Sequence, residues 1–148
     1  MLGLLDIYIE RDTFQISVLV YHINSIGFGE AMKELINVKN MSHLKKSVED
    51  AIALSLSEYK RDIEKCNFFK LTKYKTWNKF FSAHYVIGIT YDDEKLLYRI
   101  SMPERDKKTK SFGNNVSGFE FKIKKEEFDS QFDDIIKKIM DNLEKYQS

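Results

Sequence analysis

The chain has 148 residues, enough for one domain with a hydrophobic core of its own, and we expect a single domain over residues 1–148. Hydrophobic residues make up 43% of the sequence and aromatic residues 14%, a composition typical of an ordered globular protein. The formal net charge is +1, which argues against wholesale attraction to nucleic acid or to an anionic membrane surface.

The cysteine content and the N-terminus indicate the compartment. Cys66 is the one cysteine, so the sequence has no intramolecular disulfide framework. The apolar run at the N-terminus follows no basic residues and is broken at Asp6, which argues against a signal peptide. No 18 apolar residues run together, so no membrane span is predicted. We therefore expect a cytoplasmic protein.

Period-two alternation near the N-terminus predicts a β-hairpin. Apolar residues alternate with polar ones over residues 4–10 and again over residues 14–22, and Arg11-Asp12-Thr13 separates the two runs. Residues 26–29 contain two glycines and indicate a turn or bulge. Residues 31–38 fit either an edge strand or a short helix, and we predict a strand.

Apolar residues at helical spacing mark two longer segments. The first predicts a helix over residues 42–58, with Ser42 as its N-cap. The second predicts a helix over residues 126–146 with one apolar stripe. Residues 73–82 are expected to form a short helix or a structured turn.

The region between the two long helices is predicted to contain three strands. Alternation favours strands at residues 84–91, 95–102 and 118–124. Pro103 is expected to end the second of them. The charged run that starts at Glu104 and extends through Gly113-Asn114-Asn115 is expected to be an exposed loop.

A faint internal repeat suggests how these elements combine. A shift of 88 residues superposes Ser42, Leu44, Val48, Ala51 and Ile52 on Ser130, Phe132, Ile136, Ile139 and Met140. Each matched segment is helical and follows a strand-like run. The sequence therefore predicts an α+β fold, with two amphipathic helices packed against a mostly antiparallel sheet.

Residues that carry chemistry are scattered. His22, His43 and His84 show no spacing typical of a metal site or of an activated nucleophile, and we interpret them as structural or surface residues. Cys66 has a lysine beside it, but no histidine or carboxamide partner can be assigned to it. No glycine-rich phosphate loop is present.

Paired acids at residues 92–94 and 133–134 fit a hairpin turn and the first turns of a helix. We therefore predict no enzyme activity, no metal and no cofactor. An enzyme of unrecognised type would require a pocket in which His22, His84 or the paired acids converge.

Charge is distributed unevenly along the chain. Residues 60–79 carry a net charge of +5, and residues 126–144 carry −5. The basic stretch contains Phe69, Tyr74 and Trp77, which can stack on bases, so a small nucleic-acid-binding module is an alternative function. The acidic stretch can mimic phosphate and block the basic cleft of a nuclease. No nucleic-acid motif accompanies the basic stretch, so we favour a basic surface around a partly buried aromatic cluster. The corresponding structural interpretation of the acidic stretch is a solvated outer face of the helix.

Several short segments occur in a familiar order. Gly27-Phe28-Gly29 precedes the helix at Ser42 to Leu56, and Lys75-Thr76-Trp77-Asn78-Lys79-Phe80 follows. Next come Met102-Pro103-Glu104-Arg105 and a strand-then-helix unit from Gly118 to Leu143. This order resembles the immunity proteins of bacterial contact-dependent growth inhibition. The resemblance implies a protein that binds and inactivates a cognate toxin domain, commonly a nuclease acting on RNA.

The expected partner is therefore the C-terminal domain of a toxin, bound in a stoichiometric complex that blocks its active site, with no direct contact to nucleic acid or membrane. Turns and loops are where binding residues concentrate. We predict partner contacts at Tyr74 in the aromatic segment, at the turn formed by Asp92, Asp93 and Glu94, and in the charged loop at Glu104, Arg105 and Asp106.

Overall fold

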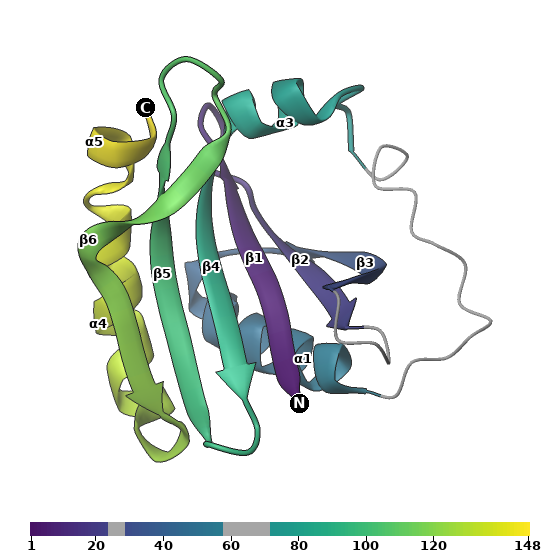
Figure 1. Ribbon diagram of the computed structural model, residues 1–148, viewed down its shortest axis with the longest axis vertical. Coiled ribbons are helices and arrows are strands. Elements are labelled where there is room, and N and C mark those ends of the chain that lie inside the picture. The colour runs from purple at the N-terminus through teal and green to yellow at the C-terminus, as the bar shows by residue number, and fades with distance from the viewer. Residues whose placement is uncertain (24–28, 58–71) are drawn as a thin grey trace.

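The computed structural model describes residues 1–23, 29–57 and 72–148, which form an α+β fold on one antiparallel sheet (Figure 1). The six described strands lie in the order β3-β2-β1-β4-β5-β6. They are β1 (Leu2–Glu10), β2 (Ile16–Ile23), β3 (Gly29–Val38), β4 (His84–Asp92), β5 (Leu97–Arg105) and β6 (Phe112–Lys124). The described helices are α1 (Leu44–Leu56), α3 (Trp77–Ala83), α4 (Phe128–Met140) and α5 (Leu143–Gln147). The predicted fold class is confirmed, and no helix in these ranges is long and apolar enough to cross a bilayer.

The sheet consists of two similar halves that meet where β1 pairs with β4. Each half is three sequential antiparallel strands followed by a helix, as the repeat in the sequence suggested. The repeat in the sequence paired Leu44 with Phe132, which is one helical turn away from the structural match. In the structure the buried Leu44 and Val48 of α1 correspond to Phe128 and Phe132 of α4. An apolar stripe recurs about every four residues, so a shift of one turn matches nearly as well.

The main core lies between the sheet and the two long helices, which Figure 1 shows behind the sheet. Alternate residues of β1, among them Leu5, Ile7 and Ile9, point to this face and are buried. Gly3 lies on the same face, where a Cβ atom would come within 3.3 Å of Ile52. The missing side chain lets α1 lie close against β1.

The opposite face of the sheet carries a smaller apolar cluster beneath α3. Tyr8, Leu19 and Val86 come from three neighbouring strands and pack with Phe80 of α3. This cluster holds α3 across the end of the sheet where β1 ends and β4 begins (Figure 1).

Two predictions about the second half of the sheet were wrong. Strand β5 continues past Pro103 to Arg105, and Pro103 pairs with Asn115 at an irregularity in the register. A proline is tolerated at such a position because its missing N–H interrupts no regular ladder. Strand β6 begins at Phe112, so the loop that was expected to extend through Asn115 covers residues 106–111.

The helix boundaries also differ from the predictions. Ser42 does not cap α1, because it lies in a 3-10 turn (Met41–His43) and its hydroxyl hydrogen-bonds with the Asn40 side chain. The predicted helix over residues 126–146 is preceded by a second 3-10 turn (Lys125–Glu127) and is interrupted at Asn142. The Asn142 side chain donates a hydrogen bond of 2.9 Å to the Lys138 carbonyl. This carbonyl lies in the last turn of α4, where main-chain acceptors lack partners within the helix.

Candidate functional site

Helix α3 begins with the motif that carried the family resemblance. The Thr76 hydroxyl accepts a hydrogen bond from the Lys79 main-chain N–H at 3.2 Å and caps the helix. The rings of Trp77 and Phe81 stack one turn apart, with centroids separated by 5.4 Å. Phe80 points to the sheet and is buried. The motif therefore anchors α3 and fixes the course of the chain that enters it.

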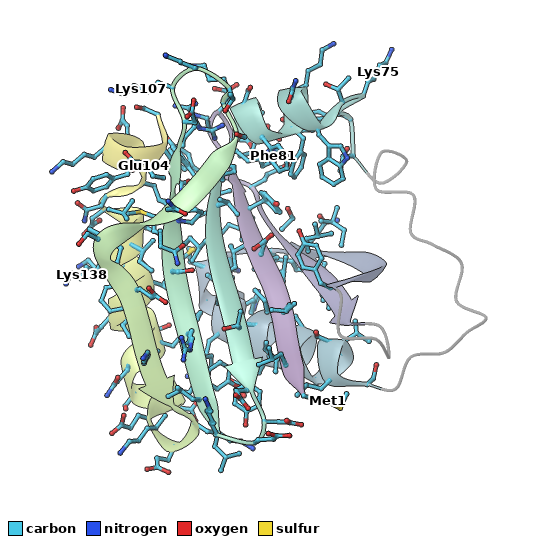
Figure 2. All side chains as sticks on the ribbon, viewed as in Figure 1. Met1, Lys75, Phe81, Glu104, Lys107 and Lys138 are labelled. Carbon is cyan, nitrogen blue, oxygen red and sulfur yellow. The ribbon has the colours of Figure 1, made fainter. Side chains whose placement is uncertain are left out.

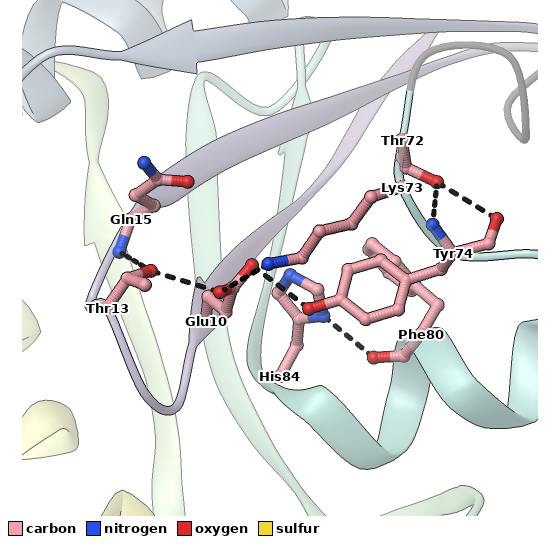
Figure 3. Close-up of polar contacts among 8 residues, drawn as sticks. All are labelled: Glu10, Thr13, Gln15, Thr72, Lys73, Tyr74, Phe80 and His84. Atoms are coloured by element: carbon pink, nitrogen blue, oxygen red, sulfur yellow. Dashed lines mark hydrogen bonds and ion pairs between the residues drawn. The ribbon is translucent and has the colours of Figure 1, made fainter.

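Beside α3 lies a cavity of about 210 Å³, which we call the Glu10 pocket (Figure 3). Glu10 ends β1 and His84 begins β4, and the two are register partners in the sheet. Lys73 and Tyr74, on the chain that enters α3, form the facing wall. The remaining lining residues are Gln15, Ile16, Ser17, Leu35, Asn37, Thr72 and Phe80.

Glu10 is an ionised carboxylate with only 7% of its surface exposed. One oxygen lies 3.1 Å from the Lys73 ammonium and 3.2 Å from the Thr13 hydroxyl, and the other accepts from the Tyr74 hydroxyl at 3.0 Å. Burial alone raises the pKa of Glu10, but these three donors outweigh it and hold the pKa below its ordinary value. Burial and the Glu10 carboxylate raise the pKa of Tyr74 to about 12, so its hydroxyl remains a donor.

His84 is 5% exposed and is held in one orientation. Its Nδ1 lies 2.7 Å from the Phe80 carbonyl oxygen, and its ring stacks on the Phe80 ring with centroids 4.1 Å apart. Because a carbonyl only accepts, Nδ1 carries the hydrogen. Burial lowers the pKa of His84, so the ring is neutral at neutral pH and Nε2 keeps a lone pair. Within the described ranges no side chain or main-chain group hydrogen-bonds to Nε2, which faces Glu10 and Lys73 in Figure 3.

The ionisable groups of the Glu10 pocket are held by structural contacts. A general base needs a pKa near the working pH and a proton within reach, whereas Glu10 is locked in three hydrogen bonds that lower its pKa. In the described structure no hydrogen bond joins Glu10 to His84, and no hydroxyl or thiol hydrogen-bonds to the His84 ring. Residues 1–23, 29–57 and 72–148 also contain no group of three or more His, Cys, Asp or Glu side chains arranged to hold a metal ion.

Four of the predicted contact residues lie at the pocket end of the sheet. Tyr74 is half-buried in the pocket wall, while Glu104 and Asp106 are exposed, and Figure 2 shows Glu104 near the end of the molecule. Asp106 accepts main-chain hydrogen bonds at 2.8 and 2.9 Å and shapes its own loop. The expected exposure of Arg105 was wrong, since only 4% of its surface is accessible.

Arg105 instead joins three segments of main chain. Its Nε donates to the Gln147 carbonyl at 2.9 Å, its Nη1 to the Lys110 carbonyl at 2.8 Å and its Nη2 to the His84 carbonyl. No ion pair with a carboxylate is found for Arg105 among the described residues, so this buried charge is stabilised by the three carbonyls and by the Phe112 ring, whose centre lies 4.4 Å from the guanidinium carbon. The residue therefore supports the strand that presents His84.

The neighbouring Gln147 completes the sheet with its side chain and is fully buried. Its amide donates to the Val86 and Pro103 carbonyls at 2.8 and 2.7 Å, and it accepts from the Val86 N–H at 2.8 Å. Regular pairing between β4 and β5 starts only at Gly88, because Pro103 offers no N–H. We call Arg105 and Gln147 together the C-terminal latch.

The three remaining contact residues, Asp92, Asp93 and Glu94, lie in the β4–β5 turn at the other end of the sheet. This turn contacts the start of the C-terminal helix, since the Lys125 N–H donates to the Leu96 carbonyl at 2.9 Å. The acidic turn at residues 92–94 and the acidic segment that starts at residue 126 are therefore neighbours, although they are far apart in the sequence. We call their exposed members the acidic end: Asp93, Glu94, Glu126, Asp129, Asp133 and Asp134.

The charges of the acidic end face solvent. The side chains of Glu94 and Asp129 are 84% and 81% exposed, and the one described lysine paired with Asp129 is Lys45 at 3.5 Å. Asp92 differs from its neighbours, because it accepts two main-chain hydrogen bonds that hold its pKa below the ordinary value and close the turn.

Most of the basic stretch at residues 60–79 lies outside the described residues, and so does Phe69. Tyr74 and Trp77, the other aromatic residues considered for base stacking, are engaged in the pocket wall and in α3. Also outside the description are Gly27 and Phe28 of the predicted turn, Cys66 and the side chain of His22, whereas Gly29 begins β3.

The sequence did not reveal the convergence of Glu10, Lys73 and His84. Lys73 and Glu10 are 63 positions apart and belong to no common motif. The sequence did contain one signal for Glu10. It is the last residue of an alternating strand, and the alternation places its side chain on the face opposite the main core.

Comparison with known proteins supports the fold alone. No family model and no curated protein matches this sequence. A solved structure of a protein of unknown function from Neisseria meningitidis is similar, with a TM-score of 0.56 and 11% sequence identity over 85% of each chain. This chain therefore shares an α+β architecture with that protein.

Proposed function

We propose that this protein is an immunity protein of contact-dependent growth inhibition, which binds the C-terminal nuclease domain of a cognate toxin in the cytoplasm and blocks its active site. The observation that carries the proposal is the acidic end. The β4–β5 turn and the segment that begins α4 meet there through the Lys125–Leu96 hydrogen bond, and both carry exposed carboxylates. These are the same two acidic segments that the sequence analysis interpreted as a partner contact and as a phosphate mimic.

The physical basis is charge complementarity. A nuclease presents cationic side chains to bind the phosphate backbone of its substrate. The side chains of Glu94 and Asp129 are more than 80% exposed, so their negative potential extends into solvent. This potential attracts a positively charged cleft. Complementary charges of this kind accelerate association and suppress wrong partners. The acids at the start of α4 also favour the helix dipole, so the fold tolerates their crowding.

The Glu10 pocket fits a non-catalytic role. Its ionisable groups are held by structural contacts, and no pair of nucleophile and base occurs among the described residues. The proposal accordingly predicts stoichiometric inhibition without turnover.

The first test is co-expression of the tagged protein with the gene immediately upstream, followed by affinity capture. We expect a one-to-one complex with the C-terminal domain of a large secreted protein, and loss of its nuclease activity at equimolar inhibitor. Absence of a protein partner, together with salt-sensitive retention of RNA or DNA, would instead support the nucleic-acid-binding alternative.

Two matched triple variants then locate the interface. One reverses three exposed charges of the acidic end, with Glu94→Lys, Glu126→Lys and Asp129→Lys. The control reverses three exposed acids at the pocket end, with Asp12→Lys, Glu104→Lys and Glu144→Lys. Each set includes one acid in the first turns of a helix, so both carry a comparable structural cost.

We expect the acidic-end variant to bind the toxin at least about a hundredfold more weakly and the control to bind within about threefold of the parent protein. The association rate of the parent complex should fall steeply as salt is raised. Strong loss in the control alone would place the interface at the Glu104 end and contradict this proposal.

A further inference from the structure

Among the buried polar side chains of the Glu10 pocket, Glu10 and His84, the unused hydrogen-bonding capacity consists of acceptors. Nε2 of His84 has a lone pair, and no described group donates a hydrogen bond to it. The residue is only 5% exposed, so water has little access to this nitrogen. A carboxylate offers about four lone-pair positions, and three donors reach Glu10. A buried acceptor without a donor is unfavourable, so the pocket is suited to a group that donates hydrogen bonds.

Lys73 shows how a cation lies in this pocket. Its ammonium is 3.1 Å from a Glu10 oxygen and 5.5 Å from the centre of the Tyr74 ring. Its side chain nevertheless remains 67% exposed, whereas that of Glu10 is 9% exposed. The ammonium therefore lies at the mouth of the pocket, and no described group hydrogen-bonds to Nε2 of His84.

We propose that the Glu10 pocket binds a guanidinium group, which displaces the Lys73 ammonium and donates hydrogen bonds to Glu10 and to Nε2 of His84. A guanidinium is a planar fork with five N–H donors and reaches two acceptors in different directions, whereas an ammonium is a point charge. The inference goes beyond the inhibitor function and does not depend on it, because it concerns a surface at the other end of the sheet.

The size and lining of the pocket agree with such a ligand. A cavity of about 210 Å³ is smaller than the range of about 300–1,000 Å³ that is usual for drug-sized ligands, so it fits one slender side chain. Leu35, Ile16 and Phe80 supply apolar walls for a methylene chain. Asn37 and Gln15 provide further carbonyl acceptors at the rim.

The binding test uses the intact protein and small probes. N-acetyl-arginine methylamide represents an arginine side chain of a protein, and agmatine represents a free guanidine metabolite. N-acetyl-citrulline methylamide has nearly the same shape without the charge. The ring-nitrogen NMR signals of His84, assigned with the His84→Asn variant, report contact at Nε2, and their titration gives the dissociation constant.

We expect both guanidinium probes to shift the His84 signals to saturation and the citrulline probe to bind at least about tenfold more weakly. Tighter binding of the arginine derivative than of agmatine assigns the site to a protein side chain, and the reverse order assigns it to a free guanidine. Equal binding of the citrulline probe, or no shift of the His84 signals, overturns the proposal.

Variants of Lys73 provide the sharper test, because they leave the buried residues intact. If Lys73 occupies the mouth of the site, Lys73→Met should tighten guanidinium binding several-fold. Lys79→Met, which removes another exposed lysine from nearby α3, should leave binding unchanged. A Lys73→Met variant that binds no better, or less tightly, shows that Lys73 is not a competitor and contradicts the mechanism.

Discussion

The two ends of the sheet treat their charges in opposite ways. At the pocket end, Glu10 and Arg105 are almost completely buried, and each is held by three hydrogen bonds. At the acidic end, Glu94 and Asp129 project into solvent with few partners. Both ends belong to the same sheet, and strands β1, β4 and β5 each run from one end to the other over nine residues, or about 30 Å.

The difference separates charges that shape the fold from charges that are available to a partner. A buried ion without its hydrogen bonds is strongly unfavourable, so substitutions at the pocket end should alter stability. An exposed charge is screened by water and salt, so substitutions at the acidic end should alter association and leave stability nearly unchanged. The predictions below test this contrast in order of decreasing effect on stability.

The largest effect is expected at Arg105. Arg105→Met keeps much of the side-chain volume but removes the donors to the His84, Lys110 and Gln147 carbonyls. We expect the free energy of unfolding, measured by urea titration, to fall by about 3 kcal/mol. Arg11→Met is the matched control, because Arg11 makes one long hydrogen bond at 3.4 Å and should cost less than about 1 kcal/mol. If both substitutions lowered the free energy of unfolding equally, Arg105 would not have the stabilising role that we assign to the C-terminal latch.

A smaller but more local effect is expected at Gln147. Gln147→Ala leaves the N–H and carbonyl of Val86 and the carbonyl of Pro103 without partners in the gap between β4 and β5. We expect a loss of about 2 kcal/mol, together with faster hydrogen exchange at the Val86 amide. Ser148→Ala changes the exposed neighbouring residue and should affect neither quantity. Unchanged exchange at Val86 would show that the side chain does not complete the sheet.

Acidification should weaken the pocket end in two steps. Burial lowers the pKa of folded His84 below its ordinary value of 6.5, so above that pH both folded and unfolded states are neutral at this residue. Below it, the unfolded state binds more protons and stability falls as the pH falls. The pKa of Glu10 is also depressed, so its contribution is complete above its ordinary value of 4.5 and is lost as the pH falls through the folded pKa.

The variant His84→Asn isolates the first step, because its amide can still donate to the Phe80 carbonyl but does not titrate. Unfolding free energies measured between about pH 8 and about pH 5 should show a flatter slope for this variant than for the parent protein. The same slope in both proteins would mean that His84 already takes up its proton in the folded state.

The fold was largely predictable because its signals are local. The alternation that defines the β1–β2 hairpin and the stripes on α1 and α4 lie within single elements. Prediction failed where a distant residue decides the outcome. Pro103 indicates the end of a strand, yet β5 continues because it still pairs with β6 at Asn115 and Phe112, and Gln147, 44 positions away, bonds the Pro103 carbonyl.

The candidate sites show the same limit. The Glu10 pocket joins residues from β1, β2, β3, α3, β4 and the chain that enters α3, and no spacing in the sequence predicts that Lys73 lies 3.1 Å from Glu10. The acidic end was recognised in two separate pieces, the turn at residues 92–94 and the helix after residue 126. Their contact depends on β6 returning the chain to the β4–β5 turn, which sequence periodicity does not specify.

The smallest effect on stability is expected at Asp129, and it is the most informative about function. Asp129→Asn removes an ion pair with Lys45 at 3.5 Å, but the Asp129 side chain is 81% exposed and the pair is screened. We expect the free energy of unfolding to change by less than about 0.5 kcal/mol. The association rate with the toxin domain, measured at low salt, should nevertheless decrease and should converge with that of the parent protein at high salt. A stability loss as large as that of Gln147→Ala would mean that this carboxylate serves the fold, and the contrast between the two ends would then not hold.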